Sequence, residues 1–210
     1  HTDYSGGLVL PMAIDLATTI VGERGGDEVR LTSAEEEGTA VVALDVDDPA
    51  SVTPPWARYV AGVVAEGIDT PSIIQSHVTT TIPVGTGLSS SAALEVAVAL
   101  ALGANSPHPE LAETLRRAEH RASGVPCGIM DQVSSLAGVE GHALLIDCTA
   151  LTVTPVGLPD GIAVVVVDSG ERRQLATSGY AERRGEVAAA QELVGPLATA
   201  TIHDVESIQH

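Results

Sequence analysis

The sequence predicts an α+β fold in which a mixed sheet packs against helices. Segments typical of strands and of helices follow each other in mixed order along the 210 residues. Residues 90–102 are almost uniformly apolar, which is typical of a buried helix. Residues 162–167 are nearly pure valine, which is typical of a buried strand. With 44% hydrophobic residues, a chain of this length can bury a core of its own.

The first half of the chain alternates between strand and helix patterns. Residues 8–21 are apolar but interrupted by Pro11, which predicts two short strands or one bent strand. Residues 28–33 and 39–46 predict two more strands, separated by an acidic turn at 35–38. The elements that follow are a loop at 47–55, a helix at 56–67, a strand at 72–82 and the buried helix at 90–102.

The second half begins with an amphipathic helix at 110–121. A turn at 123–132 contains Gly, Pro and Cys and leads into a short helix that ends near residue 136. The remaining predicted elements are strands at 143–147, 151–156 and 162–167, and a helix at 180–193 whose charged run, residues 182–184, lies on its exposed side.

Charge and cysteine content exclude several classes of partner. A net charge of −18 argues against nucleic acid or an anionic membrane surface as a partner. Apolar runs are interrupted before they reach the length of a membrane span, so no membrane partner is expected. Cys127 and Cys148 form no metal-binding or disulfide pattern, and we expect them to be small reduced core residues.

Residues 83–93, PVGTGLSSSAA, form a segment that we call the glycine–serine loop. Its glycines let the backbone take left-handed angles, and its serines precede the N–H groups of a helix start. Such a loop is suited to an anion, because the N–H groups and the helix dipole both favour negative charge. A plain loop of small residues with a good N-cap is the alternative. A Walker A loop is excluded, since the chain contains no lysine.

Several segments, in order, resemble the galactokinase family of the GHMP small-molecule kinase superfamily. They are HTDYSGG at 1–7 with VLPMAI at 9–14, GLSSSAA at 87–93, AEH at 118–120, PCGIMDQ at 126–132, HALLIDC at 142–148, and SGY at 178–180 with the arginine pair at 183–184. The resemblance implies the GHMP kinase fold. Residues 1–157 would form its ribosomal protein S5 domain 2-like N-terminal domain, and residues 158–210 the beginning of a second domain.

The resemblance also implies an activity, which is transfer of the γ-phosphoryl group of ATP to the anomeric hydroxyl of α-galactose. Asp131 would be the catalytic base or electrostatic partner, although it could simply cap the helix that follows it. Ser91 and Glu119 would hold Mg²⁺, a cation suited to hydroxyl and carboxylate oxygens. Implied sugar contacts are His1, Asp3, Gly128, Asp131 and Tyr180; implied ATP contacts are Gly85, Gly87, Leu88, Ser89, Ser90, Ser91, Ala92 and Trp56.

Some implications remain open on the sequence alone. Trp56 and Tyr59 fall near the adenine in this family but are equally suited to the core. A related sugar kinase, such as N-acetylgalactosamine kinase, is the nearest alternative activity. The second alternative is a non-catalytic sensor of galactose and ATP. In such sensors the serine motif is shortened, whereas residues 89–93 of this chain form a complete motif.

The resemblance further implies a cytoplasmic enzyme of galactose metabolism, and it does not set the oligomeric state. In the family, the signature begins upstream of the position of His1, with arginine and glutamate residues. A Gly-rich third motif lies near the end of full-length family members. Neither is present in this sequence. We therefore expect the chain to be part of a longer enzyme and do not expect it to complete the reaction alone.

Overall fold

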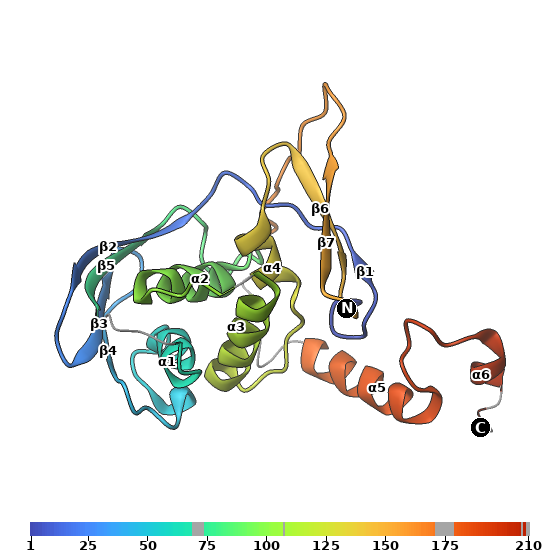
Figure 1. Ribbon diagram of the computed structural model, residues 1–210, viewed down its shortest axis with the longest axis horizontal. Helices are drawn as coiled ribbons and strands as arrows, with labels where there is room; N and C mark the ends of the chain where they lie inside the picture. Colours follow the sequence, from blue (N-terminus) through green and yellow to red (C-terminus); the bar gives the residue numbers. More distant parts are fainter. Residues whose placement is uncertain (69–73, 107, 171–178, 207, 209–210) are drawn as a thin grey trace.

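The computed structural model describes residues 1–68, 74–106, 108–170, 179–206 and 208, and it contains two sheets (Figure 1). The four-stranded sheet has the order β2-β5-β3-β4, and β3 runs parallel to β5, so this sheet is mixed. The three-stranded sheet has the antiparallel order β1-β6-β7. The strands are β1 Leu8–Val9, β2 Thr18–Arg24, β3 Glu28–Ser33, β4 Thr39–Ala43, β5 Ile74–Thr80, β6 His142–Asp147 and β7 Thr152–Gly157.

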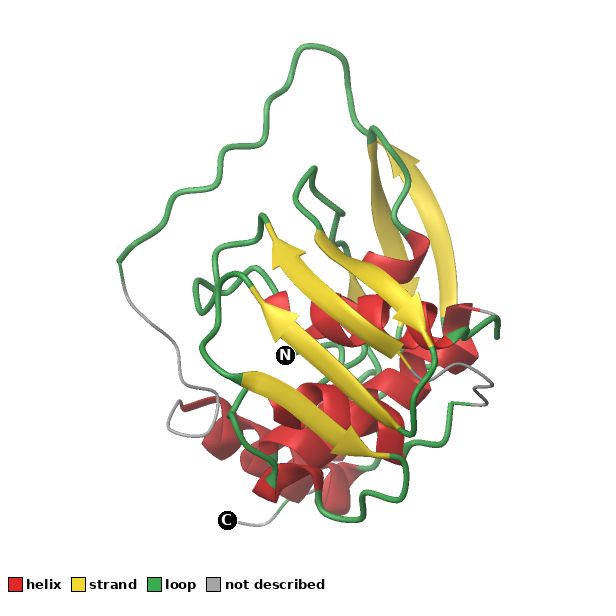
Figure 2. Ribbon diagram, turned by 90° about the vertical axis from the view of Figure 1, so that its left-hand side faces the viewer, coloured by secondary structure: helices red, strands yellow, loops and turns green. Residues whose placement is uncertain are grey.

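Four helices lie between the two sheets (Figure 1). They cover one face of the four-stranded sheet, whereas its opposite face, turned toward the viewer in Figure 2, carries no helix in the described part of the chain. These helices are α1 Ala57–Ala65, α2 Ser90–Leu102, α3 His108–Ser123 and α4 Met130–Ala137. The other helical elements are η1 Pro49–Ser51, α5 Gly179–Val194 and α6 Ile202–Glu206. Among the described residues, no helix is both long and apolar enough to cross a membrane.

Alternating side chains fix the larger core. Val29 and Leu31 of β3 are buried, while the residues between and after them face outward. Ala40 and Val42 of β4 repeat the pattern, so both strands present one apolar face to the helices. A smaller core joins α3 and α4 to β6, and its members are Ala112, Ile129, Val133, Leu144 and Ile146.

Most predicted elements are confirmed. Residues 8–21 form two strands rather than one, and these belong to different sheets. The helix at 90–102 and the strand at 28–33 have the predicted bounds, whereas β4 ends three residues before the predicted end at residue 46. Of the strand predicted at 72–82, residues 72 and 73 lie outside the described residues.

The strand predicted at residues 162–167 is wrong. This segment has no regular secondary structure, and its side chains are exposed, with Val165 at 78% and Val167 at 82%. A valine run becomes a buried strand only if neighbouring strands and a covering layer accept it. None of the described strands pairs with this segment.

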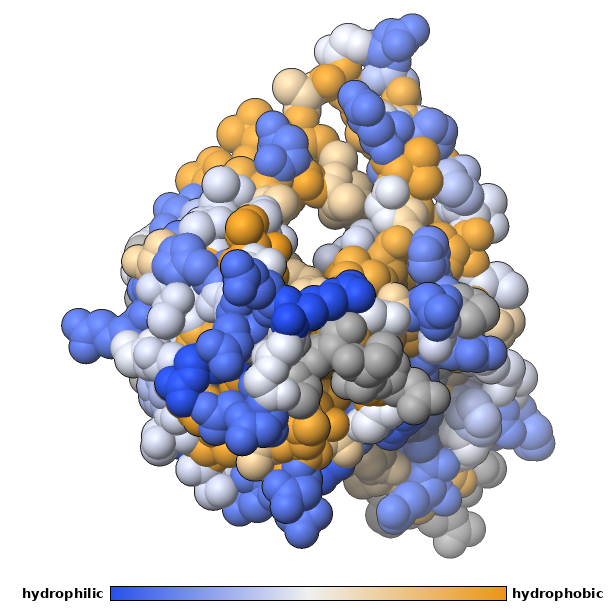
Figure 3. Space-filling model, turned by 60° about the vertical axis from the view of Figure 1, so that its left-hand side comes forward, coloured by the Kyte–Doolittle hydropathy of each residue, from blue (hydrophilic) through white to orange (hydrophobic). Residues whose placement is uncertain are grey.

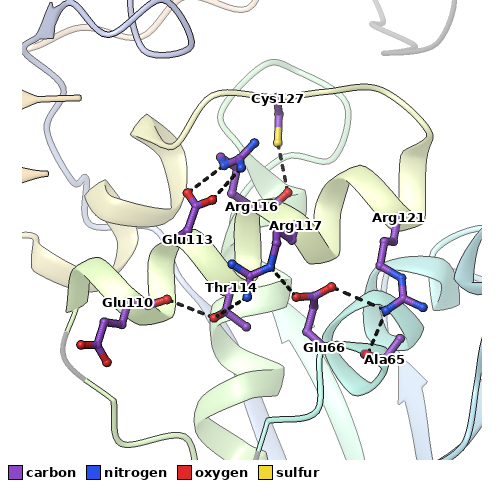
Figure 4. Close-up of polar contacts among 9 residues, drawn as sticks. All are labelled: Ala65, Glu66, Glu110, Glu113, Thr114, Arg116, Arg117, Arg121 and Cys127. Atoms are coloured by element: carbon purple, nitrogen blue, oxygen red, sulfur yellow. Dashed lines mark hydrogen bonds and ion pairs between the residues drawn. The ribbon is translucent and has the colours of Figure 1, made fainter. Parts of the chain in front are cut away.

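Close packing joins α1 to α3. A Cβ added at Gly62 would lie 2.4 Å from the Ala118 carbonyl oxygen, so only glycine fits at this crossing. Figure 4 shows how α3 also holds the end of α1. Arg121 donates to the Ala65 carbonyl at 2.9 Å, and Arg117 Nε donates to Glu66 Oε2 at 2.7 Å. The Ala65 carbonyl at the C-terminus of α1 thereby receives a donor that the helix itself does not supply.

Replacing Gly62 by alanine is therefore expected to destabilise the fold. The new methyl group would press on backbone rather than on a flexible side chain, and such overpacking reduces the free energy of unfolding by about 1–3 kcal/mol. Urea denaturation measures this loss. Gly185→Ala in α5 is the matched control, because a Cβ there meets nothing within 4 Å. Equal unfolding midpoints for Gly62→Ala and the unaltered protein would contradict the close approach.

Candidate active site

The glycine–serine loop leads into α2 through left-handed backbone. Gly85 and Gly87 have φ of 74° and 87°, and an added Cβ at either would meet nothing within 4 Å. Ser89, directly before α2, has φ 57° and ψ 43°, which is unusual for a residue with a side chain. The loop is therefore open to a ligand at the N-terminus of a 13-residue helix, where an anion is favoured.

Ser89 occupies the N-cap position of α2, but its side chain makes no capping hydrogen bond to the helix. Its hydroxyl instead donates to the carboxylate of Asp131. The plain N-cap alternative therefore does not describe Ser89. A residue in this backbone region is strained, and such strain is concentrated at functional sites.

Asp131 lies in the first turn of α4, whose N-cap is Ile129, so the capping alternative for Asp131 is also wrong. Burial raises the pKa of Asp131 above its usual range. The hydrogen bond from Ser89 acts in the opposite direction, while the charges of Glu119 and Asp3 raise the pKa further. Asp131 thus lies beside the glycine–serine loop and near two other carboxylates.

The N-terminal segment packs directly on the turn that precedes α4. A Cβ added at Gly128 would lie 1.6 Å from Asp3 Oδ2, so the Asp3 carboxylate occupies the space that any other residue would fill. A hydrogen bond links the Gly128 backbone to Tyr180 of α5. The Tyr180 ring stacks on the His1 ring with centroids 5.7 Å apart. His1, Asp3, Gly128 and Tyr180, predicted from separate motifs, are therefore brought together.

Arg184 corrects the prediction that the whole charged run of α5 is exposed. It is half-buried, with its guanidinium 4.6 Å from the centre of the Tyr4 ring. Its Nη1 donates to the Tyr4 carbonyl at 3.2 Å. Because Tyr4 also contacts the rings of His1 and Tyr180, Arg184 fastens α5 to the N-terminal segment. Ser178, the first residue of the SGY motif, lies outside the described residues.

Ser91 and Glu119, the two residues predicted to hold a metal ion, are in hydrogen-bond contact. Ser91 Oγ of α2 donates to Glu119 Oε1 of α3 at 2.7 Å, and Glu119 is buried. A hydroxyl and a carboxylate in contact fit Mg²⁺, which prefers hard oxygen ligands and usually retains phosphate oxygens and water. Within the described ranges, no group of three or more His, Cys, Asp or Glu residues could hold a metal ion.

Sequence reasoning missed a buried polar cluster beside this pair. Glu95 and Gln132 are both completely buried. Gln132 Nε2 donates to Glu119 Oε2 at 2.6 Å and to Glu95 Oε2 at 3.4 Å. The available signal was a single glutamate within the apolar helix at 90–102, which no hydrophobic pattern explains.

The buried Glu95 predicts a pH-dependent stability. Burial, and then the charge of Glu119, raise its pKa well above 4.5 in the folded state. Between 4.5 and that raised pKa the folded protein holds the extra proton, so the free energy of unfolding falls as pH rises, by at most about 1.4 kcal/mol per pH unit. We expect Glu95→Gln to remove this dependence.

Urea midpoints at pH 4, 6 and 8 measure the effect. The stability advantage of Glu95→Gln over the unaltered protein should grow from pH 4 to pH 8. Glu140→Gln, at an exposed position, provides the matched control. An advantage for Glu95→Gln that is constant with pH would contradict the raised pKa.

The structure places Trp56 among core residues. It is 7% exposed, and its Nε1 donates to the Glu37 carbonyl at 3.2 Å. This burial favours the core alternative over an adenine contact. Tyr59 is half-buried, and burial raises its pKa to about 12, with Glu119 and Glu95 as the next contributions. Both cysteines are free and half-buried.

A separate cavity of about 1070 Å³ is lined in part by the glycine–serine loop. Figure 3 shows a hollow bordered by apolar surface on one side of the molecule. The cavity wall combines loop residues Pro83, Thr86 and Leu88 with segments 12–16, 138–141 and the exposed run near 162–168. Asp3, Asp131 and Tyr180 are not part of its wall, so it is distinct from the cluster around Asp131.

Two family models match the chain. Residues 57–139 match the GHMP kinases N terminal domain, and residues 1–24 match the galactokinase galactose-binding signature. The galactokinase of Bos taurus is 39% identical over 98% of this chain and 55% of its own length. The galactokinase of Chloroflexus aggregans is 42% identical over 93% of this chain and 52% of its own length. The chain thus spans about half the length of the curated relatives it matches.

Solved structures confirm the predicted fold class. The crystal structure of Lactococcus lactis galactokinase complexed with galactose matches 91% of this chain and 52% of its own, with a TM-score of 0.77 and 28% identity. Methanococcus jannaschii mevalonate kinase matches 76% of this chain and 51% of its own, with a TM-score of 0.59 and 19% identity, a similarity of fold alone. The division into domains at residue 157 stays a prediction.

Proposed function

We propose that this chain, which has the GHMP kinase fold and carries the galactokinase galactose-binding signature, belongs to a protein that phosphorylates galactose with ATP. The observation that carries the proposal is the position of Asp131. Its carboxylate accepts a hydrogen bond from Ser89 of the glycine–serine loop, and the Asp3 and Glu119 carboxylates both act on its pKa. Asp131 therefore interacts both with the loop suited to phosphate and with a residue of the predicted sugar-contact cluster.

In this proposal the sugar is held by the cluster around Gly128. The carboxylate of Asp3, which rests against Gly128, would accept hydrogen bonds from galactose hydroxyls, and the rings of His1 and Tyr180 would line the same pocket. A site that hydrogen-bonds each hydroxyl discriminates between epimers, because a misplaced hydroxyl leaves a buried group unpaired at about 1–3 kcal/mol.

The chemical step follows from the same residues. Asp131, when ionised, would accept the proton of the anomeric hydroxyl while that oxygen bonds to the γ-phosphorus of ATP and the bond to the β-phosphate oxygen breaks. Backbone N–H groups of the glycine–serine loop and the N-terminus of α2 would stabilise negative charge on the phosphates. Mg²⁺, held through Ser91 and Glu119, would supply further charge neutralisation there.

An assay of the protein that contains this chain tests the function. We expect ADP release that depends on ATP, Mg²⁺ and galactose together, with galactose 1-phosphate as product. N-acetylgalactosamine and mevalonate provide the comparison substrates. Preferential consumption of either would assign a related kinase instead. Galactose binding without any turnover would assign a sensor.

A further inference from the structure

Three helices meet in a buried polar cluster, of which the proposed chemistry uses only Glu119. Glu95 comes from α2, Glu119 from α3 and Gln132 from α4. Gln132 lies between the two carboxylates and donates to both, at 2.6 Å to Glu119 Oε2 and at 3.4 Å to Glu95 Oε2. Glu95 and Gln132 have no exposed surface at all, so the cluster is sealed from solvent on their side.

Such a cluster is unfavourable for folding by itself. Two buried carboxylates near each other repel, and a buried polar atom without a partner costs about 1–3 kcal/mol. Glu95 Oε1 and Gln132 Oε1 both lack a hydrogen-bond partner within the described residues. An apolar group of similar size in place of Glu95 would pack as well in a helix that is otherwise almost entirely apolar. Its position beside the site therefore calls for a functional explanation.

We propose that Gln132 is a positioning residue that fixes the orientation of the Glu119 carboxylate. The two oxygens of Glu119 have separate partners, because Oε1 accepts from Ser91 Oγ and Oε2 accepts from Gln132. With Oε2 held, Oε1 stays directed at Ser91 and is available to a cation together with the serine oxygen. This inference rests on the proposed function, in which Ser91 and Glu119 hold Mg²⁺.

Glu95 keeps the Gln132 amide in the required orientation. The amide group has two N–H donors and one oxygen, and its donors face the two carboxylates. The reversed amide would set its oxygen against a carboxylate oxygen, which is repulsive. Glu95 thus acts on Glu119 through Gln132, as groups that hydrogen-bond a metal ligand commonly do.

The arrangement also connects the metal ligand to the proposed base. Gln132 directly follows Asp131 in the first turn of α4, so one helix carries both side chains. Asp131 is directed to Ser89 before α2, and Gln132 is directed to Glu119 of α3. A displacement of α4 would therefore change the position of the proton acceptor and of the metal ligand together.

The test replaces Gln132 by methionine, which retains the size of the side chain but cannot donate. The probe is Mn²⁺ bound with a non-hydrolysable ATP analogue, followed by electron paramagnetic resonance in the protein that contains this chain. We expect Mn²⁺ affinity to fall about 10–100-fold, the usual effect of removing a group that orients a ligand. Galactose affinity without nucleotide should be unchanged. Gln75→Met, at an exposed position of β5, makes the same chemical change as a matched control.

Unchanged Mn²⁺ affinity in folded Gln132→Met would overturn the proposal. If Gln132→Met does not fold, Glu95→Met is tested instead. This variant removes only the Glu95 acceptor that orients the Gln132 amide. Its Mn²⁺ affinity should also fall, and an unchanged value would also overturn the proposal. Measurements on the unaltered protein distinguish a failure of this inference from a failure of the proposed function. Failure of the unaltered protein to bind Mn²⁺ with the analogue, or to phosphorylate galactose, counts against the proposed function itself.

Discussion

Replacing Asp131 by asparagine is expected to lower kcat for galactose phosphorylation by about 10²–10⁴-fold, the usual contribution of a positioned general base. Asparagine keeps the shape of the side chain but cannot accept the proton of the anomeric hydroxyl. Ser89 can still donate to the amide oxygen, so the loop should keep its conformation. Galactose affinity should therefore change little, which separates loss of chemistry from loss of binding.

The pH profile provides a second measurement on the same residue. Burial raises the pKa of Asp131, and the base acts only when ionised, so kcat should fall as pH falls through that raised pKa. This acidic limb should be absent from the residual activity of Asp131→Asn. Asp45→Asn, at an exposed position after β4, is the matched control. Full activity of Asp131→Asn would remove Asp131 from the mechanism.

Replacing Gly128 by alanine is expected to weaken galactose binding by about 10–100-fold, the effect of losing a hydrogen bond to a charged group. The new Cβ would lie 1.6 Å from Asp3 Oδ2 and 2.1 Å from its Cγ. The Asp3 side chain must then rotate away from its present position. The fold should persist, because the atoms displaced belong to one side chain rather than to the backbone.

Isothermal titration with galactose measures this loss, and a double-mutant cycle identifies its cause. If Gly128→Ala acts by displacing Asp3, it should have little further effect on a protein that already carries Asp3→Ala. Additive losses in the double variant would mean that Gly128 acts on galactose independently of Asp3. Unchanged galactose affinity in Gly128→Ala would contradict the placement of Asp3 in the sugar pocket.

Local patterns in the sequence were sufficient for most of the secondary structure, for a physical reason. In β3 and β4 the alternation of side chains records directly which face meets the helices. The failure at residues 162–167 shows the limit of this reasoning. A valine run records a preference for burial between strands, but the neighbours that would satisfy it must come from elsewhere in the fold, and none of the described strands provides them.

The candidate site was predicted by resemblance for the residues inside motifs and missed where a side chain acts across helices. Ser91 and Glu119 were predicted as a pair, and the structure places them in hydrogen-bond contact. The role of Glu95 was missed, because its partner Gln132 is 37 residues away. A single glutamate in an apolar helix does not indicate which residue its side chain contacts. Arg184 was misjudged for a similar reason, since the Tyr4 carbonyl that turns it inward lies 180 residues away.

The left-handed backbone of Ser89 has a consequence for engineering this protein. A residue with a side chain in that conformation costs roughly 1 kcal/mol relative to glycine. Selection for heat resistance alone would therefore favour Ser89→Gly, which relieves the strain but removes the hydroxyl that donates to Asp131. Thermal tolerance and turnover place opposite demands on this position, so a stabilisation programme should hold Ser89 constant and seek its gains on the exposed surface.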